Sequence, residues 1–311
     1  VHFEHRVVDF IMENDKIVGV KLDNGKIFYS DVIILAVGHS ARELFRLLQT
    51  YRVALENKPF AVGFRIEHPQ DFINKHQYRA YADSPHLGAA DYQLTYHDNQ
   101  TNRGVYTFCM CPGGEVVLAS SEEGRLCVNG MSYHSRDKEN ANSAILVSVD
   151  ERDYGSEPLA GLKFQEMLEE KAFSLTGESN VAPVQTLVDF CNQKITTQLG
   201  QVSPSVVNYK LSNLSSLLPQ HLYRQLKEAL GEFDKKFSDF AMEDAILTGI
   251  ETRSSSPLKL LRDKSSFRSI SHSTLYPIGE GAGYAGGIVS SAIDGIKVSR
   301  KIMEQYTKAE K

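Results

Sequence analysis

The sequence predicts an α/β fold in which one domain is interrupted by a second, α+β domain. Three observations lead to this prediction. An apolar run at residues 32–37 ends at Gly38, a glycine-rich segment at 279–287 separates a short strand from a helix, and the long region between them mixes strand and helix patterns. The first two patterns are typical of strand–turn–helix units of one sheet, so the middle region is expected to be an insertion.

The first segment of the chain predicts a β-meander. Its first strand is expected to begin near Phe3 and to include Val7. Turns are expected at 14–15 and at 23–25, because Asn, Asp and Gly tolerate the positive φ that tight hairpins require.

The apolar run that follows the meander is β-branched and apolar on both faces, which is typical of a strand buried between two layers. It ends at Gly38, and a helix is expected over 41–49 with Ser40 as its N-cap. Doubly wound folds bind ligands at the carboxyl ends of their strands, so Gly38 and His39 are candidate ligand contacts.

The middle region predicts both kinds of element. Strands are expected at 60–66, 104–110 and 115–119, and amphipathic helices at 161–175 and 219–233. Such a mixture favours an α+β domain.

The last segment returns to the strand–turn–helix pattern. A short strand is expected at 275–278, and a helix at 288–306 has apolar residues at helical spacing. The expected domains are therefore residues 1–54 with 250–311, and an inserted domain at 55–249.

Composition excludes several classes of protein. The 311 residues have a formal net charge of −5, which gives no general attraction to nucleic acid. No apolar run approaches the roughly 18 residues that a membrane helix needs. The four cysteines and ten histidines show no metal-ligand spacing, so no metal site is expected. We therefore expect a reduced cytoplasmic protein without a nucleic-acid or membrane partner.

The segment 279–287 has five glycines among nine residues, and residues 281–286 satisfy the pattern G-x-G-x-x-G. A nicotinamide-binding unit would need a second parallel strand after the following helix, and only five residues follow Tyr306. We therefore reject that interpretation. Glycines still allow close approach to a ligand, and the helix start offers unpaired N–H groups, so an electronegative ligand group is expected there.

A strand, a glycine turn and a helix in this order resemble the last unit of glutathione-reductase-type FAD domains, which have a Rossmann-like, FAD/NAD(P)-binding fold. The resemblance implies that Glu280 binds the ribityl chain of FAD and that the helix start faces the flavin. The run that ends at Gly38 resembles the strand that crosses such domains. Val7 lies where those proteins place backbone atoms against the adenine.

Seven stretches of the chain carry a second resemblance: 37–42, 58–63, 109–114, 129–132, 140–144, 251–257 and 279–287. In these stretches, and along essentially its whole length, the chain resembles a bacterial family of FAD-dependent dehydrogenases of largely unassigned substrate. The resemblance implies a preceding region with the family's first Gly-rich loop, which this sequence lacks.

The candidate site residues fall into two groups. The candidate cofactor contacts are Val7, Gly38, His39, Gly279, Glu280, Gly281, Gly286, Gly287 and Ile288. The candidate catalytic residues are Arg253, Cys111 and Tyr284. Arg253 is interpreted either as a receptor for a carboxylate or a flavin oxygen, or as part of a structural ion pair. Tyr284 either lines the flavin or packs, and Cys111 either lies in a loop near the flavin ring or is a buried free thiol.

The function that follows is an FAD-dependent oxidoreductase that passes a hydride or an electron pair between the flavin and a small-molecule substrate, with NAD(P)H or another electron donor. The inserted domain would cover the flavin and select the substrate. Two alternatives remain open. One is a flavin-using RNA-modifying protein, which the acidic net charge disfavours. The other is a non-catalytic fragment that keeps the fold without the cofactor.

Overall fold

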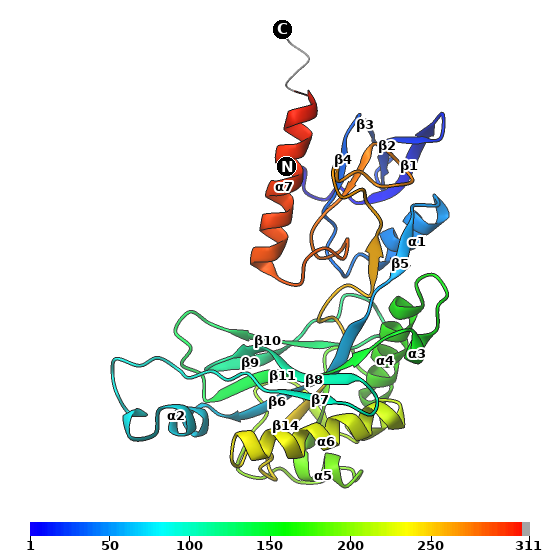
Figure 1. Cartoon of the computed structure of the whole chain (residues 1–311). Helices are drawn as coiled ribbons and strands as arrows, with labels where there is room; N and C mark the ends of the chain where they lie inside the picture. Colours follow the sequence, from blue (N-terminus) through cyan, green and yellow to red (C-terminus); the bar gives the residue numbers. More distant parts are fainter. Residues whose placement is uncertain (307–311) are drawn as a thin grey trace. The chain divides into compact units, whose positions relative to one another are not determined.

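The structure is a computed structural model that describes residues 1–306 and contains two compact, mixed α/β units (Figure 1). Unit 1 comprises Val1–Phe60, Asp150–Lys163 and the chain from Ser254 onward. Unit 2 comprises Ala61–Val149 and Phe164–Arg253. No helix among the described residues is long and apolar enough to cross a bilayer.

Unit 1 contains a three-stranded antiparallel meander, two strand pairs and short and long helices. Its elements are β1 (Val7–Glu13), β2 (Lys16–Leu22), β3 (Ile27–Tyr29), β4 (Ile33–Leu35), α1 (Arg42–Thr50), β5 (Leu55–Asn57), α3 (Glu151–Tyr154), β15 (Leu258–Leu260), β16 (Leu275–Pro277) and α7 (Ile288–Tyr306). The meander has the order β1-β2-β3, β15 pairs with β5 in antiparallel fashion, and β16 pairs with β4 in parallel.

The core of unit 1 joins segments that are far apart in the sequence. Phe10 of β1, Phe45 of α1 and Leu275 of β16 belong to one cluster of buried apolar side chains. Burial of each large apolar side chain stabilises the fold by about 1.5–3 kcal/mol relative to exposure. The N-terminal and C-terminal segments therefore depend on one another for their stability.

Several details of the first segment differ from the sequence-based expectation. The first strand begins at Val7, because Phe3 is 83% exposed and has no strand to pack against. Helix α1 begins at Arg42 with Ala41 as its N-cap and no side-chain cap bond, so the assignment of Ser40 is wrong. Strand β4 covers three residues, and Ile34 is 45% exposed, so its expected burial on both faces is not found.

The Rossmann-like part of the expected fold class is not established by unit 1. Its described residues form one parallel strand pair, β4 with β16. A doubly wound sheet needs further parallel strands. The coarser class, mixed α/β, is what the structure shows.

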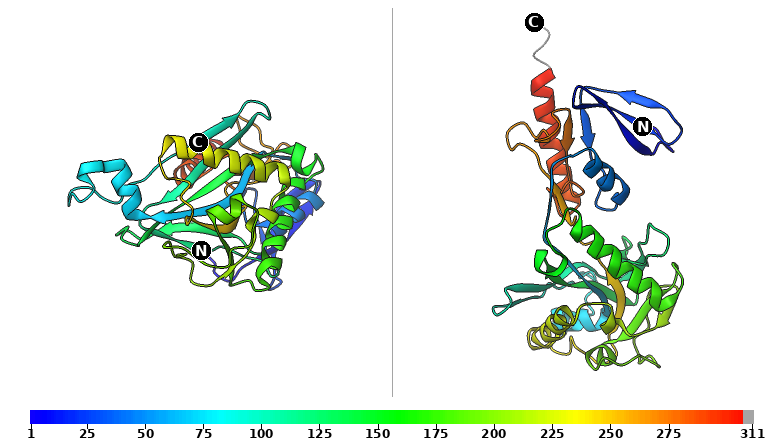
Figure 2. Two further views of the ribbon diagram at one scale, coloured as in Figure 1. Left: turned by 90° about the horizontal axis from the view of Figure 1, so that it is seen from below. Right: turned by 90° about the vertical axis from the view of Figure 1, so that its right-hand side faces the viewer.

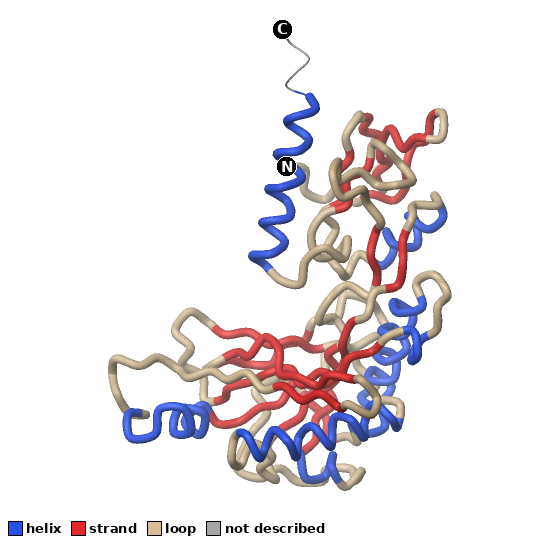
Figure 3. Tube along the Cα trace, in the orientation of Figure 1, coloured by secondary structure: helices blue, strands red, loops and turns tan. Residues whose placement is uncertain are grey.

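Unit 2 is built on a seven-stranded mixed sheet with the order β13-β12-β14-β6-β11-β8-β7, which Figure 3 shows in red. The seven strands are β6 (Phe60–Pro69), β7 (Thr95–Asp98), β8 (Arg103–Cys111), β11 (Asn140–Val149), β12 (Ala182–Thr186), β13 (Tyr209–Leu211) and β14 (Ile246–Glu251). Strands β9 (Gly114–Leu118) and β10 (Val128–Ser132) form a separate antiparallel pair. The helices are α2 (Gln70–Tyr78), α4 (Ala160–Thr176), α5 (Leu187–Cys191) and α6 (Gln220–Lys236), with short 3-10 turns at Arg79–Tyr81 and Leu214–Ser216.

The central strands of this sheet are covered on both faces. Strands β6 and β11 are buried along almost their whole length. Figure 1 shows α6 on one face of the sheet and the β9–β10 hairpin on the other, and the view from below in Figure 2 shows α6 lying along the strands. The first half of β6 is apolar, as is usual for a strand covered on both faces, whereas its second half buries Arg65, Glu67 and His68.

The expected elements of the middle region all exist, with ends that differ by one to three residues. Helix α4 extends one residue beyond the expected range at each end, and α6 begins one residue later and ends three residues later. Such differences are normal at helix ends, which fray.

Candidate functional site

The candidate site lies in unit 1, where two parallel strands end next to each other. Strand β4 pairs with β16 in the register Ile33 with Leu275 and Leu35 with Pro277. The carboxyl ends of parallel strands meet at the same edge of a sheet. The turns that follow, at Gly38 and at Gly279, therefore lie together.

The two turns touch through their backbones. A side chain at Gly281 would place its Cβ 2.2 Å from the carbonyl oxygen of Gly38 and 2.8 Å from its nitrogen. Gly38 and Gly279 have φ values of +69° and +72°, which favour glycine. Glycine is thus required at these three positions for the turns to meet.

A polar contact between side chains joins the same two turns. His39 Nδ1 lies 3.0 Å from Glu280 Oε1, and each side chain is about a quarter exposed, at 25% and 24%. An ionised carboxylate only accepts hydrogen bonds, so this contact needs a proton on Nδ1. The structure therefore brings together Gly38, His39, Gly279, Glu280 and Gly281, which the sequence predicted separately.

A buried aspartate of α7 holds the second turn in place. Asp294 accepts a hydrogen bond of 2.8 Å from the Gly279 amide and a two-pronged ion pair from Arg262, at 2.6 and 3.0 Å. Burial raises the pKa of Asp294, but the hydrogen bonds from Arg262 and Gly279 outweigh it, and the pKa is lowered overall. This pair was not predicted from the sequence, because a single Asp in an amphipathic helix normally indicates a solvated face.

Tyr284 packs against the same arginine. The guanidinium of Arg262 lies 3.6 Å from the centre of the Tyr284 ring, and the Arg262 amide donates to the Tyr284 hydroxyl at 3.1 Å. The ring also contacts the apolar core of unit 1. Of the two interpretations of Tyr284, packing fits these contacts.

At the start of α7, three backbone amides have no acceptor among the described residues. The Gly286 amide donates to Ser290 Oγ, and the first backbone bond of the helix runs from the Ser291 amide to the Gly287 carbonyl. Within residues 1–306, no hydrogen bond is found from the amides of Gly287, Ile288 and Val289. Ile288 is 91% exposed, and an added Cβ at Gly286 or Gly287 would have no atom within 4 Å. The helix start is thus open and electropositive.

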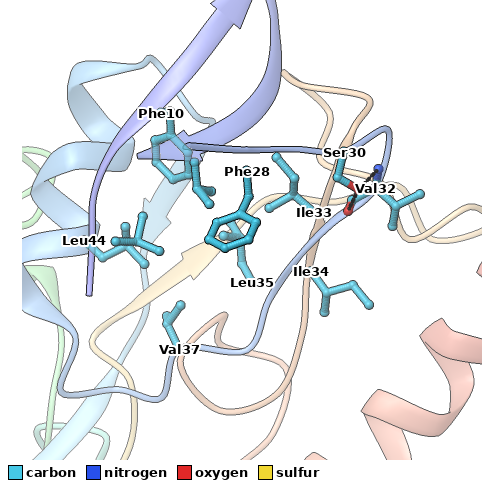
Figure 4. A pocket seen from close by; sticks show the side chains of 11 residues that line it. Phe10, Phe28, Ser30, Val32, Ile33, Ile34, Leu35, Val37 and Leu44 are labelled. Carbon is cyan, nitrogen blue, oxygen red and sulfur yellow. Dashed lines mark hydrogen bonds between the residues drawn. The ribbon is translucent and has the colours of Figure 1, made fainter. Parts of the chain in front are cut away.

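Val7 belongs to a different part of unit 1. It lines an apolar cavity of about 360 Å³ that also contacts Phe28 and Leu35 (Figure 4). The cavity reaches Val37, the residue before Gly38. Val7 and the residue that precedes the Gly38 turn therefore line the same cavity.

A lysine that the sequence analysis did not select lies in the same region. Burial lowers the pKa of Lys58, and the negative charge of Glu280 opposes this shift. Lys58 follows β5, and its amide donates to the Pro257 carbonyl at 2.9 Å. Lys58 belongs to the stretch 58–63, which carries part of the family resemblance. Its closeness to Glu280 was not predicted, because the two residues are more than 200 positions apart in the sequence.

Two candidate catalytic residues lie in unit 2. Arg253 makes a two-pronged ion pair with the fully buried Glu169, at 3.0 and 2.8 Å, and donates to Ser121 Oγ at 2.6 Å. These contacts fit the structural interpretation of Arg253. The Cys111 thiol donates to the Cys109 carbonyl at 3.3 Å, and burial raises its pKa. A raised pKa disfavours the thiolate that nucleophilic chemistry requires.

A glycine turn between a parallel strand and a helix is a local feature that also occurs in nucleotide-cofactor folds. Residues 59–254 match the family described as "FAD-dependent protein, C-terminal domain-like". This match covers more than half of the chain, and the chain belongs to that family.

One relative and two solved structures complete the comparison. An uncharacterized protein of Clostridium beijerinckii is 48% identical over 98% of this chain, and the chain spans 57% of that relative's length. A salicylate hydroxylase substrate complex is 12% identical, with a TM-score of 0.32, 89% of this chain covered and 45% of that chain. A Rab GDI from Plasmodium falciparum is 15% identical, with a TM-score of 0.25, 47% of this chain covered and 25% of that chain. TM-scores this low carry no structural argument.

Proposed function

We propose that this protein is an FAD-dependent oxidoreductase of the dehydrogenase type, and that the turn and helix start at 279–289 hold the flavin end of FAD. The observation that carries the proposal is the open start of α7, where the amides of Gly287, Ile288 and Val289 have no acceptor among the described residues. Such amides bind electronegative ligand groups. The family of the chain supports FAD as that ligand.

The residues present fit such a cofactor. Gly286 and Gly287 leave open space above the backbone, so a flat ring can approach the helix start. Glu280 offers acceptor oxygens for the hydroxyl groups of the ribityl chain, and His39 holds one of those oxygens at 3.0 Å. The cavity beside Val7 is apolar and large enough for part of an adenine.

FAD supplies the chemistry when it is bound, because it accepts or donates a hydride or an electron pair. The chain's own residues would bind and orient it. The amides at the start of α7 would attract electron-rich atoms, and the Asp294–Arg262 pair would keep the Gly279 turn rigid. We assign Arg253 and Tyr284 to structure, and unit 2 to the substrate. NAD(P)H or another donor would reduce the flavin.

A titration with FAD tests the proposal. The purified chain is expected to quench flavin fluorescence with saturation at one FAD per chain, and Glu280→Ala should weaken binding about tenfold, because it removes hydrogen bonds of an ionised group. Glu13→Ala is the matched control, since Glu13 is an exposed glutamate on the meander of the same unit. Equal affinities of the Glu280→Ala and control variants, or no binding by the unmodified chain, would refute the proposal.

A further inference from the structure

A buried arginine organises one face of the sheet in unit 2. Arg65 of β6 is fully buried and pairs with Glu251 of β14 at 2.5 and 3.2 Å. It also donates to the Cys109 carbonyl at 2.8 Å, to Asn142 Oδ1 at 3.2 Å and to Asn129 Oδ1 at 2.7 Å. Four stretches selected in the sequence, 109–114, 129–132, 140–144 and 251–257, thus supply partners to one side chain.

The backbone of β10 lies directly on this cluster. A Cβ at Gly130 would lie 2.1 Å from Asn142 Oδ1 and 2.5 Å from Arg65 Nη1. A Cβ at Gly114 would lie 2.3 Å from the Met131 carbonyl oxygen. Gly130 therefore lets β10 lie directly against Arg65 and Asn142, and Gly114 lets β9 approach β10 closely.

A cavity of about 740 Å³ opens above this hairpin. Stretches 109–114 and 129–132 provide its walls through Met110, Cys111, Pro112, Gly130, Met131 and Ser132, and the loop 133–136 completes it. The volume is within the range of about 300–1,000 Å³ that is usual for sites of small molecules.

The loop that completes the cavity is fixed by hydrogen bonds. Ser132 Oγ donates to the Pro112 carbonyl at 2.7 Å, and the Lys138 amide donates to the Gly113 carbonyl at 3.2 Å. The Gly113 amide in turn donates to the buried Gln70 Oε1 at 2.6 Å. The cavity is therefore preformed.

One permanent positive charge lines the cavity, that of Arg136. No lysine, aspartate or glutamate is among the described residues that line it. The nearby Glu115 is held by Lys138 at 3.7 Å and by the Tyr133 hydroxyl at 3.1 Å. In the described residues no hydrogen bond or ion pair involves the Arg136 side chain. A planar guanidinium group can donate two parallel hydrogen bonds to the two oxygens of a carboxylate.

We propose that this cavity binds a small organic carboxylate, with the carboxylate at Arg136 and the apolar body of the ligand between Met110 and Met131. Methionine side chains adapt to flat or irregular apolar groups. Cys111 and Ser132 add a thiol and a hydroxyl to the wall. The proposal of a carboxylate site is based on contacts within unit 2 alone. That this site binds the substrate of the enzyme rests on the proposed function.

The test uses the purified chain without added FAD and three probes of one size: benzoate, benzamide and benzylamine. Calorimetry should show benzoate binding at least tenfold more tightly than benzamide, with no binding of benzylamine, because only benzoate carries a negative charge. Arg136→Ala should remove this preference, and Arg136→Lys should keep part of it. Arg224→Ala is the control, since Arg224 is an exposed arginine of α6 away from the cavity lining.

Equal affinities for benzoate and benzamide would overturn the proposal, and so would an unchanged benzoate affinity in Arg136→Ala. Inorganic phosphate that competes for the cavity as strongly as benzoate would also overturn it, because this result would indicate a general anion site. Because the titration contains no FAD, its result is independent of flavin binding. Benzoate binding by a chain that fails to bind FAD would keep the carboxylate site and refute the proposed function.

Discussion

Gly286→Val separates the ligand-binding role of the α7 turn from its structural role. An added Cβ at Gly286 has no protein atom within 4 Å, and Gly286 is exposed. The free energy of unfolding should therefore change by no more than about 0.5 kcal/mol, as for an ordinary surface substitution. The valine side chain would instead occupy the open space through which a ligand approaches the amides of Gly287 and Ile288.

The loss of flavin affinity can be worked from those amides. A hydrogen bond between neutral groups contributes about 0.5–1.5 kcal/mol, and the acceptor atoms of oxidised flavin are neutral. The loss of two such bonds should therefore weaken binding by about fivefold to 150-fold. Flavin fluorescence titration measures the affinity, and urea unfolding measures the stability.

Gly231→Val is the control for this substitution. Gly231 lies on the exposed side of α6 in unit 2, also with no atom within 4 Å of an added Cβ. We expect this variant to bind FAD like the unmodified chain. If Gly286→Val also bound FAD with unchanged affinity, the reasoning about the helix start would be refuted.

Two further predictions concern buried ion pairs. Asp294→Asn should lower the free energy of unfolding at neutral pH. The pKa of the Asp294 carboxyl is lower in the folded than in the unfolded state, so the carboxylate stabilises the fold at pH values above its unfolded pKa. This stabilisation is lost as the pH falls through the folded pKa. Urea unfolding from pH 7 down into the acid range below the ordinary aspartate pKa should therefore show the stability difference between the two proteins shrink, and a constant difference would contradict this. Glu251→Gln should lower the free energy of unfolding of unit 2 by about 3–5 kcal/mol, because it leaves the buried Arg65 charge without its carboxylate partner. A change below about 1 kcal/mol in urea unfolding would show that the ion pair does not stabilise unit 2.

The sequence predicted elements whose pattern is local. Helix α7 has the bounds expected from its apolar spacing, and the glycine turn lies between β16 and α7 as expected. His39 and Glu280 were each selected from the sequence as ligand contacts, but their pairing was not predicted, because the two residues are 241 positions apart. Local periodicity was sufficient for the helix and the turn.

Long-range polar partners could not be predicted. Arg65 occurs in an otherwise apolar run, and its carboxylate partner is 186 residues later in the chain. The sequence pattern around Asp294 is that of a solvated helix residue. Its contacts with Arg262 and the Gly279 amide are seen only in the structure. A single sequence carries no signal for such pairs, because the free energy of the contact depends on burial that only the tertiary structure creates.

A crystal structure of the protein with FAD tests the central claim most directly. We expect an electron-rich atom of the flavin end of FAD within hydrogen-bond distance of the Gly287 or Ile288 amide, with Glu280 beside the ribityl chain. FAD bound elsewhere, with the start of α7 still facing solvent, would contradict the account.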